Sequence, residues 1–207
     1  APVSGRRLKV VIDAGNGMAG HTAPAVFDRL GDQVEVVPMF FELDGTFPNH
    51  EANPIEPANL VDLQKRVLAE KADIGLAFDG DADRCFLVDE RGELVSPSTL
   101  TGLIAARELT REPGATIIHN LITSRSVPEI VTELGGTPVR TRVGHSFIKA
   151  TMAETDAIFG GEHSGHFYFR DFWRADSGML AACTRWPRAG RGGRSRCRRL
   201  LQQYVRF

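Results

Sequence analysis

The chain has 207 residues, which is room for one large domain or for two domains of about 100 residues each. With 42% hydrophobic and 25% charged residues, its composition is that of an ordinary globular protein. No stretch approaches the ~20 consecutive apolar residues that span a bilayer, and the N-terminus has no apolar signal core. The three scattered cysteines, Cys85, Cys183 and Cys197, indicate a reducing compartment and lack the spacing of a zinc site. We therefore expect a cytoplasmic enzyme or binding protein that does not enter a membrane.

The net charge of −1 conceals an uneven distribution. Residues 185–207 hold eight arginines and no acidic residue, which leaves 17 basic and 26 acidic side chains in residues 1–184. An acidic body argues against nucleic acid as its partner. We expect residues 185–207 to be a disordered or aberrant terminus, for which a shifted reading frame is one origin. A tail that binds nucleic acid or an anionic surface is the alternative.

Strand and helix patterns alternate along the chain. Apolar runs predict strands at residues 8–12, 34–38, 74–78, 116–119 and 138–143. Two sets of apolar residues recur with helical spacing: Leu60, Leu63 and Val67, and then Val127, Ile130, Val131 and Leu134, after which Gly135-Gly136 ends the helix. This alternation predicts an α/β fold of two successive α/β domains, with mixed, largely parallel sheets flanked by helices. The pattern breaks in the turn-rich residues 90–99, so we predict domains at 1–97 and 98–184, followed by the basic tail at 185–207.

The first predicted strand leads into Gly15-x-Gly17-x-x-Gly20, and a helix follows. That arrangement fits the fingerprint of dinucleotide-binding folds. However, the acidic residue expected at the end of the second strand is missing, because "VEVVPMFF" ends in apolar residues. Nucleotide binding is therefore the weaker interpretation, and a structural turn is the stronger one.

Three aspartates, Asp79, Asp81 and Asp83, alternate in the stretch "FDGDADRC" between two apolar runs. Two unit charges ~4 Å apart repel by roughly 4 kcal/mol at an effective dielectric constant of ~20, so a cation among them would offset a large cost. Hard divalent cations such as Mg²⁺ prefer carboxylate oxygens. The loop is thus a predicted Mg²⁺ site in a tight turn between two strands.

Three alternatives remain for this loop. An EF-hand would place its ligands at Asp79, Asp81, Asp83 and Glu90, but Arg84 occupies the position of the turn glycine and strands flank the loop. An Asp-x-Asp phosphatase would use Asp79 as its nucleophile. A solvated acidic turn would have no ligand at all.

A second polar loop, "GGEHSGHFYF", lies between two predicted strands. Glu162, Ser164 and His166 alternate along it and would point to one side. A carboxylate and a hydroxyl with this spacing can bind adjacent sugar hydroxyls, and an imidazole can transfer a proton. Upstream, Gly144-His145 follows a strand and begins a helix, where His145 could meet an anionic ligand. We expect Lys149 to begin the exposed face of that helix.

These motifs together resemble those of the α-D-phosphohexomutases, the superfamily of phosphomannomutase and phosphoglucomutase. "DGDADR" is similar to the family's metal loop, "GEHSGH" to its sugar-recognition loop, and "VGH" to a substrate contact. The glycines at 15–20 match a structural turn at the start of the family's second domain. The resemblance implies the following roles: Asp79, Asp81 and Asp83 bind Mg²⁺, Arg84 is a catalytic group on the phosphate side, His166 is a catalytic acid/base or a phosphate contact, and Glu162, Ser164 and His145 bind substrate.

The resemblance runs from about residue 5 to residue 183 and covers the second and third of the family's four domains. The family's phosphoserine motif and its C-terminal phosphate-binding loop have no match here, and Ile122 stands where many relatives have a basic residue that Arg125 need not replace. We therefore expect a fragment of a phosphomannomutase-type enzyme. Its partners would be a hexose phosphate and the missing domains of the same enzyme. His163 and the "DGDADRC" form favour mannose over glucosamine. A non-catalytic sugar-phosphate-binding remnant is the alternative from another class.

Overall fold

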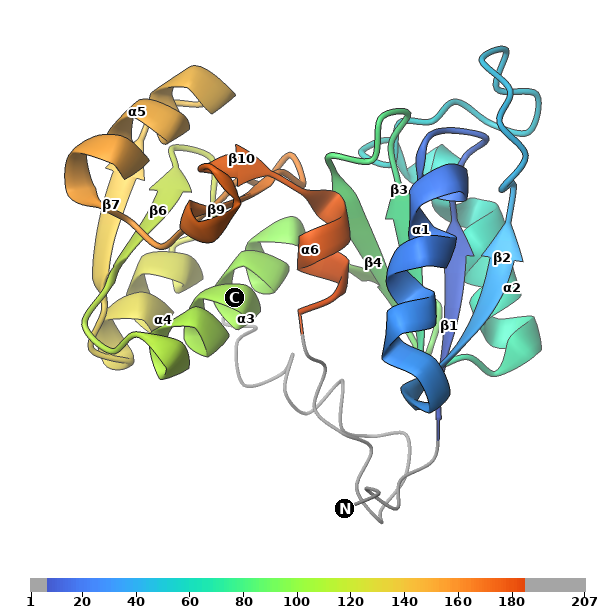
Figure 1. The fold of residues 1–207 in the computed structure, drawn as a ribbon, viewed down its shortest axis with the longest axis horizontal. Coiled ribbons are helices and arrows are strands. Elements are labelled where there is room, and N and C mark those ends of the chain that lie inside the picture. Colours follow the sequence, from blue (N-terminus) through green and yellow to red (C-terminus); the bar gives the residue numbers. More distant parts are fainter. Residues whose placement is uncertain (1–6, 185–207) are drawn as a thin grey trace.

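The computed structural model describes residues 7–184, and they form two five-stranded mixed sheets that lie side by side (Figure 1). In the first sheet the strand order is β2-β1-β3-β4-β5. Its strands are β1 (Leu8–Asp13), β2 (Val34–Met39), β3 (Ile74–Phe78), β4 (Cys85–Asp89) and β5 (Leu94–Val95). In the second sheet the order is β10-β9-β8-β6-β7. Its strands are β6 (Thr116–Asn120), β7 (Thr137–Thr141), β8 (Phe159–Gly161), β9 (Phe167–Phe169) and β10 (Ala175–Asp176).

Each sheet combines a parallel half with an antiparallel half. In the first, β1 pairs in parallel with β2 and β3, whereas the β3–β4 and β4–β5 pairs are antiparallel. In the second, β6 pairs in parallel with β7 and β8, whereas the β8–β9 and β9–β10 pairs are antiparallel. The predicted class, two α/β units with mixed sheets and flanking helices, is confirmed. Parallel strands bring the loops after their carboxyl ends to one edge, so each sheet gathers its polar loops at that edge.

Two of the helices follow the apolar periodicity predicted within residues 60–67 and 127–134, although Leu134 itself is exposed. The bounds of the helices are α1 (Ala19–Phe27), η1 (Asp28–Gln33), η2 (Pro57–Leu60), α2 (Val61–Glu70), α3 (Pro97–Arg111), α4 (Ser126–Glu133), α5 (His145–Thr155), η3 (Arg170–Phe172) and α6 (Gly178–Ala182). Leu63 and Val67 of α2 are buried against the first sheet, and Leu60 is buried in the turn before them. Gly135 follows α4 with a φ of 78°, which is the left-handed conformation that ends many helices.

One apolar core is continuous between the two sheets. It includes Ile12 and Leu76 of the first sheet, Ile117 and Phe159 of the second, and side chains of α1, α3 and α6. Helix α6 lies between the sheets, where it contacts β4 and α1 (Figure 1). Two smaller clusters cover the outer faces: α2 packs on the first sheet and α5 on the second. The shared core therefore fixes the polar edges of the two sheets relative to each other.

Two sequence predictions bear on the ends of these units. The domain boundary between residues 97 and 98 falls at the start of α3, where the Ser96 hydroxyl accepts a hydrogen bond from the Ser98 amide at 3.3 Å, and it stays a prediction. The predictions for the basic tail concern residues outside the described part of the chain. Within residues 7–184, no helix combines the length and the apolar character needed to cross a membrane.

Candidate functional site

The aspartate loop joins β3 to β4, as the sequence predicts. Carboxylate oxygens of Asp79, Asp81 and Asp83 lie within 4.8 Å of one another. Asp79 is buried, Asp81 is exposed and Asp83 lies between these extremes, so the cluster opens to solvent on one side. Ala82 adopts a φ of 65°, and this left-handed residue turns the backbone between the last two aspartates.

The environment of Asp83 fits a bound cation. Its Oδ1 atom is buried and receives no hydrogen bond from any residue in 7–184. Burial and the neighbouring charge of Asp79 raise the pKa of Asp83 to about 6, although His166 opposes this rise. A carboxylate that lies beside two others and has an oxygen without a hydrogen-bond donor is a natural ligand for a hard divalent ion. The donor set thus suits Mg²⁺.

Arg84, the last residue of this loop, is held by hydrogen bonds to Asp79 and Asn53. Its backbone amide donates to Asp79 Oδ1 at 3.0 Å, and its Nε donates to Asp79 Oδ2 at 2.6 Å. Its Nη1 donates to Asn53 Oδ1 at 3.2 Å. Because both Asp79 oxygens accept hydrogen bonds from Arg84, the arrangement disfavours Asp79 as a free nucleophile.

Glu162 of the second loop is buried, with 2% of its surface exposed. Its Oε1 accepts hydrogen bonds from Asn120 Nδ2 at 3.0 Å and from the Gly144 amide at 3.2 Å. Its Oε2 accepts one from the Tyr168 hydroxyl at 2.8 Å. Burial and the charge of Glu162 raise the pKa of Tyr168, so this hydroxyl keeps its proton and donates it to the hydrogen bond. Glu162, in the loop after β8, is therefore hydrogen-bonded to the end of β6 and to the loop after β7.

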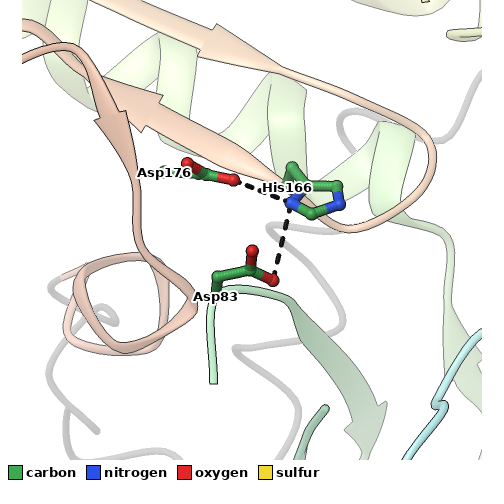
Figure 2. A group of neighbouring side chains, drawn as sticks. All are labelled: Asp83, His166 and Asp176. Atoms are coloured by element: carbon green, nitrogen blue, oxygen red, sulfur yellow. Dashed lines mark hydrogen bonds and ion pairs between the residues drawn. The ribbon is translucent and has the colours of Figure 1, made fainter. Parts of the chain in front are cut away.

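His166, at the end of the second polar loop, lies beside Asp83 of the aspartate loop and Asp176 of β10, as Figure 2 shows. Its Nδ1 is 2.9 Å from Asp176 Oδ2 and 3.6 Å from Asp83 Oδ1. The backbones also meet here, because Arg84 and His166 form an antiparallel bridge and the Cys85 amide donates to the Gly165 carbonyl at 3.1 Å. The predicted catalytic histidine and the predicted metal loop are thus adjacent in space.

The charges around His166 favour its protonated form. Burial lowers the pKa of His166, but the hydrogen bond to Asp176 and the charge of Asp83 outweigh burial, and the net shift is upward. For Asp176, burial acts in the opposite sense, and the contacts with His166 and Lys149 lower its pKa to about 2. Both shifts favour the ion pair between the protonated imidazole of His166 and the carboxylate of Asp176.

The remaining predicted residues lie around this centre. Ser164 is partly buried in the same turn as Glu162. His145 is exposed at the first position of α5, directly after Gly144, whose amide is bound to Glu162. Lys149 differs from expectation: its Nζ lies 3.2 Å from Asp176 Oδ1 and 5.8 Å from the centre of the Tyr168 ring. The helix places it one turn after His145, on the side that faces β10.

Several polar residues of this site are not evident from the sequence. Asp176 in "ADSG" belongs to no recognisable motif, and its pairing with His166 depends on the β9–β10 hairpin. Asn120 is the last residue of β6, and Tyr168 is the middle residue of β9. A polar residue at the carboxyl end of a predicted parallel strand was the only available signal, and it applies to Asn120 alone.

The sequence places this constellation in a known family. Residues 1–92 match the family described as phosphoglucomutase/phosphomannomutase, alpha/beta/alpha domain II, and residues 97–202 match alpha/beta/alpha domain III of the same family. The chain therefore belongs to the phosphoglucomutase/phosphomannomutase family.

Individual relatives agree with this assignment. The chain is 47% identical over 176 residues to a phosphomannomutase of Escherichia coli K12, a match that covers 84% of this chain and 39% of the relative. It is 44% identical to a phosphomannomutase/phosphoglucomutase of Pseudomonas aeruginosa PAO1, over 84% of this chain and 38% of the relative. A crystal structure of a family protein from Burkholderia thailandensis superposes with a TM-score of 0.81 at 43% identity, covering 86% of this chain and 38% of that one. The chain thus spans about two fifths of the length of these relatives.

Proposed function

We propose that this chain supplies the metal-binding and sugar-binding parts of a phosphomannomutase-type enzyme, which interconverts mannose 6-phosphate and mannose 1-phosphate. The observation that carries the proposal is the contact between the two polar loops. The aspartate cluster, Arg84 and His166 meet in one place, and Glu162 holds the neighbouring loops of the second sheet. Such a site can face a phosphate from one side and a sugar from the other.

The metal role and the role of Arg84 follow from the observed surroundings, and the substrate-binding roles follow from the family resemblance. Asp79, Asp81 and Asp83 would hold Mg²⁺, which when bound would offset negative charge on the transferring phosphoryl group. Arg84 presents its remaining guanidinium hydrogens to a phosphate oxygen. Ser164 and Glu162 would bind sugar hydroxyls, and His145 would contact the substrate phosphate. His166, oriented by Asp176, is the candidate to give a proton to a sugar oxygen and to take it back.

The phosphoryl group itself would come from a serine outside the two matched segments. The mutase reaction requires two transfers through a bisphosphorylated sugar that turns around between them. We therefore expect the 207-residue chain alone to bind Mg²⁺ weakly and to have little mutase activity. A cytoplasmic location, and glucose phosphate as a second substrate, belong to the same proposal.

The metal site is tested by titrating Mg²⁺ into the 207-residue chain in a calorimeter. Asp81 is exposed, so Asp81→Asn removes a ligand charge with little effect on folding, and we expect affinity to fall roughly tenfold or more because ligand charge sets affinity for hard cations. Asp62→Asn, an exposed carboxylate on α2, is the matched control and should leave affinity unchanged. Equal affinities for all three chains would remove the metal site from the proposal.

The activity is tested on the product of the complete reading frame, with coupled assays on mannose 1-phosphate and glucose 1-phosphate. Turnover that depends on Mg²⁺ supports the mutase. A phosphoryl group trapped on Asp79 would instead indicate the phosphatase, and sugar-phosphate binding without turnover would indicate the non-catalytic remnant.

A further inference from the structure

A long loop of the first unit lies directly against the metal loop. We call residues 40–56, between β2 and η2, the 40–56 loop. It contains no strand and no helix, yet it reaches the metal loop at two points. One contact is made to the backbone of Gly80 and the other to the side chain of Arg84.

The contact at Gly80 is van der Waals packing of side chains against the backbone. A Cβ atom built on Gly80 would lie 3.6 Å from Phe47 Cζ and 3.9 Å from Ala52 Cβ, so these side chains pack on the backbone between Asp79 and Asp81. Phe47 adopts a φ of 50° to do so, and Phe40 at the start of the loop has a φ of 54°. Left-handed conformations of this kind cost of order 1–3 kcal/mol each and persist only where surrounding contacts hold them.

The contact at Arg84 is a hydrogen bond. Asn53 Oδ1 accepts from Arg84 Nη1 at 3.2 Å, while Asp79 Oδ2 accepts from Arg84 Nε at 2.6 Å. The guanidinium is planar, so two acceptors on different edges fix its orientation. Its Nη2 donates to no residue of the described chain, which leaves the Nη2 hydrogens available for an anion.

Asn53 is itself held in place by neighbouring groups. Asn59 Nδ2 donates to the Asn53 carbonyl at 2.9 Å, and Pro54, the next residue, is buried. A residue before proline has restricted backbone freedom, which further limits the positions that the Asn53 amide can reach. The side chain of Asn53 is thus presented to Arg84 by a fixed backbone.

The rest of the 40–56 loop is tied to the glycine turn after β1. His50 Nε2 lies 3.0 Å from the buried Asp13 Oδ2, and Asn49 Nδ2 donates to Asn16 Oδ1 at 2.7 Å. Asn16 Nδ2 in turn donates to the Glu42 carbonyl at 2.8 Å. These bonds secure both halves of the loop without touching Arg84, so they provide natural controls.

We propose that Asn53 is a positioning residue that holds the Arg84 guanidinium in the orientation needed to bind the phosphate of a hexose phosphate. The inference rests on the proposed function, because it assigns the Nη2 hydrogens of Arg84 to the substrate phosphate. Asn53 acts through Arg84. Within the described part of the chain, Asn53 forms no hydrogen bond with the carboxylates of the aspartate loop or with the sugar loop.

The test measures binding of mannose 6-phosphate to the 207-residue chain at saturating Mg²⁺, by calorimetry. Asn53→Ala should weaken binding about tenfold, since a misplaced charged hydrogen bond costs about that factor. Arg84→Ala should weaken it at least as much. In the Arg84→Ala background, adding Asn53→Ala should change affinity less than about twofold, because two residues that act as one unit are not additive.

Asn49→Ala is the matched control, because it removes a hydrogen bond of the same loop that does not involve Arg84. It should lower the midpoint of thermal unfolding as Asn53→Ala does, yet leave the affinity for mannose 6-phosphate within about twofold. Additive losses for Asn53 and Arg84, or equal losses for Asn49 and Asn53, would show that Asn53 only stabilises the loop and would overturn the inference.

Two further outcomes separate the inference from the function on which it rests. A loss of affinity with Arg84→Ala but none with Asn53→Ala overturns the inference alone, whereas no loss with Arg84→Ala overturns the phosphate role of Arg84 and the inference with it.

Should Asn53→Ala fail to fold, nitrogen-15 NMR of the unaltered chain tests the same inference. Bonds at Nε and Nη1 slow guanidinium rotation and should give separate Arg84 Nη signals, and a single averaged signal would contradict the proposal.

Discussion

At the scale of single residues, the Asp13–His50 pair couples the stability of the fold to pH. The hydrogen bond to Asp13 raises the pKa of His50 to about 9, against the opposing effect of burial. The other groups that act on this imidazole are the Glu51 carbonyl, which is 2.9 Å from Nδ1, and the more distant charge of Asp62. A histidine whose pKa rises on folding stabilises the folded state fully below its unfolded pKa of about 6.5.

We therefore expect the free energy of unfolding to fall as the pH rises from about 6.5 through about 9. The loss assigned to His50 should be about 2 kcal/mol after allowance for its partial exposure. Urea unfolding of the chain and of His50→Gln across this range measures it, since the difference between the two removes contributions from other groups. His21→Gln, at an exposed histidine of α1, should reproduce the unaltered profile. Parallel profiles for the chain and His50→Gln would contradict the assignment.

At the scale of elements, the glycine turn after β1 packs directly against the aspartate loop. A Cβ atom on Gly17 would lie 2.6 Å from the Gly80 carbonyl oxygen, and the Met18 amide donates to that same oxygen at 2.9 Å. The turn thus packs on the metal loop through backbone alone. This approach explains the glycine at 17 without a nucleotide ligand.

Gly17→Ala should therefore destabilise the chain by about 1–3 kcal/mol, the usual cost of overpacking, and should weaken Mg²⁺ binding because Gly80 must move. Gly45→Ala is the control, because a Cβ there meets no atom within 4 Å, and we expect a change within about 0.5 kcal/mol. Denaturant unfolding and Mg²⁺ calorimetry report the two effects. A Gly17→Ala chain that keeps both properties would mean that the turn and the metal loop are independent.

The elements themselves were largely predictable because their apolar periods are strong. The predicted strand at 74–78 matches β3, whose five residues are all buried, and the helix predicted from Leu63 and Val67 is α2. The site was predictable only where a motif was continuous in sequence, as in the two polar loops. Asn53, Asp176 and Lys149 act across 31, 10 and 27 residues of chain, and only the tertiary structure brings such pairs together.

At the scale of the whole molecule, the continuous core indicates that the two sheets unfold together. Apolar residues of both sheets belong to one cluster with α1, α3 and α6, and this cluster is the largest of the three. Helix α6 also packs closely on the end of the aspartate loop: a Cβ on Gly178 of α6 would lie 2.5 Å from the Arg84 carbonyl oxygen. A site assembled from both sheets requires that neither sheet opens alone.

Two truncations, one in each outer cluster, test this cooperativity. Val67→Ala truncates a side chain of the outer cluster on the first sheet, and Ile148→Ala truncates one of the outer cluster on the second. Cavity formation should lower the free energy of unfolding by about 1–3 and 2–5 kcal/mol respectively.

If the sheets form one cooperative unit, each variant lowers the midpoint of a single urea transition, and native-state hydrogen exchange accelerates in both sheets. If they are independent, each variant accelerates exchange in its own sheet alone and the Ile148→Ala transition splits in two. We expect the single transition, because separate unfolding of either sheet would expose the apolar surfaces that α3 and α6 bury in the shared core.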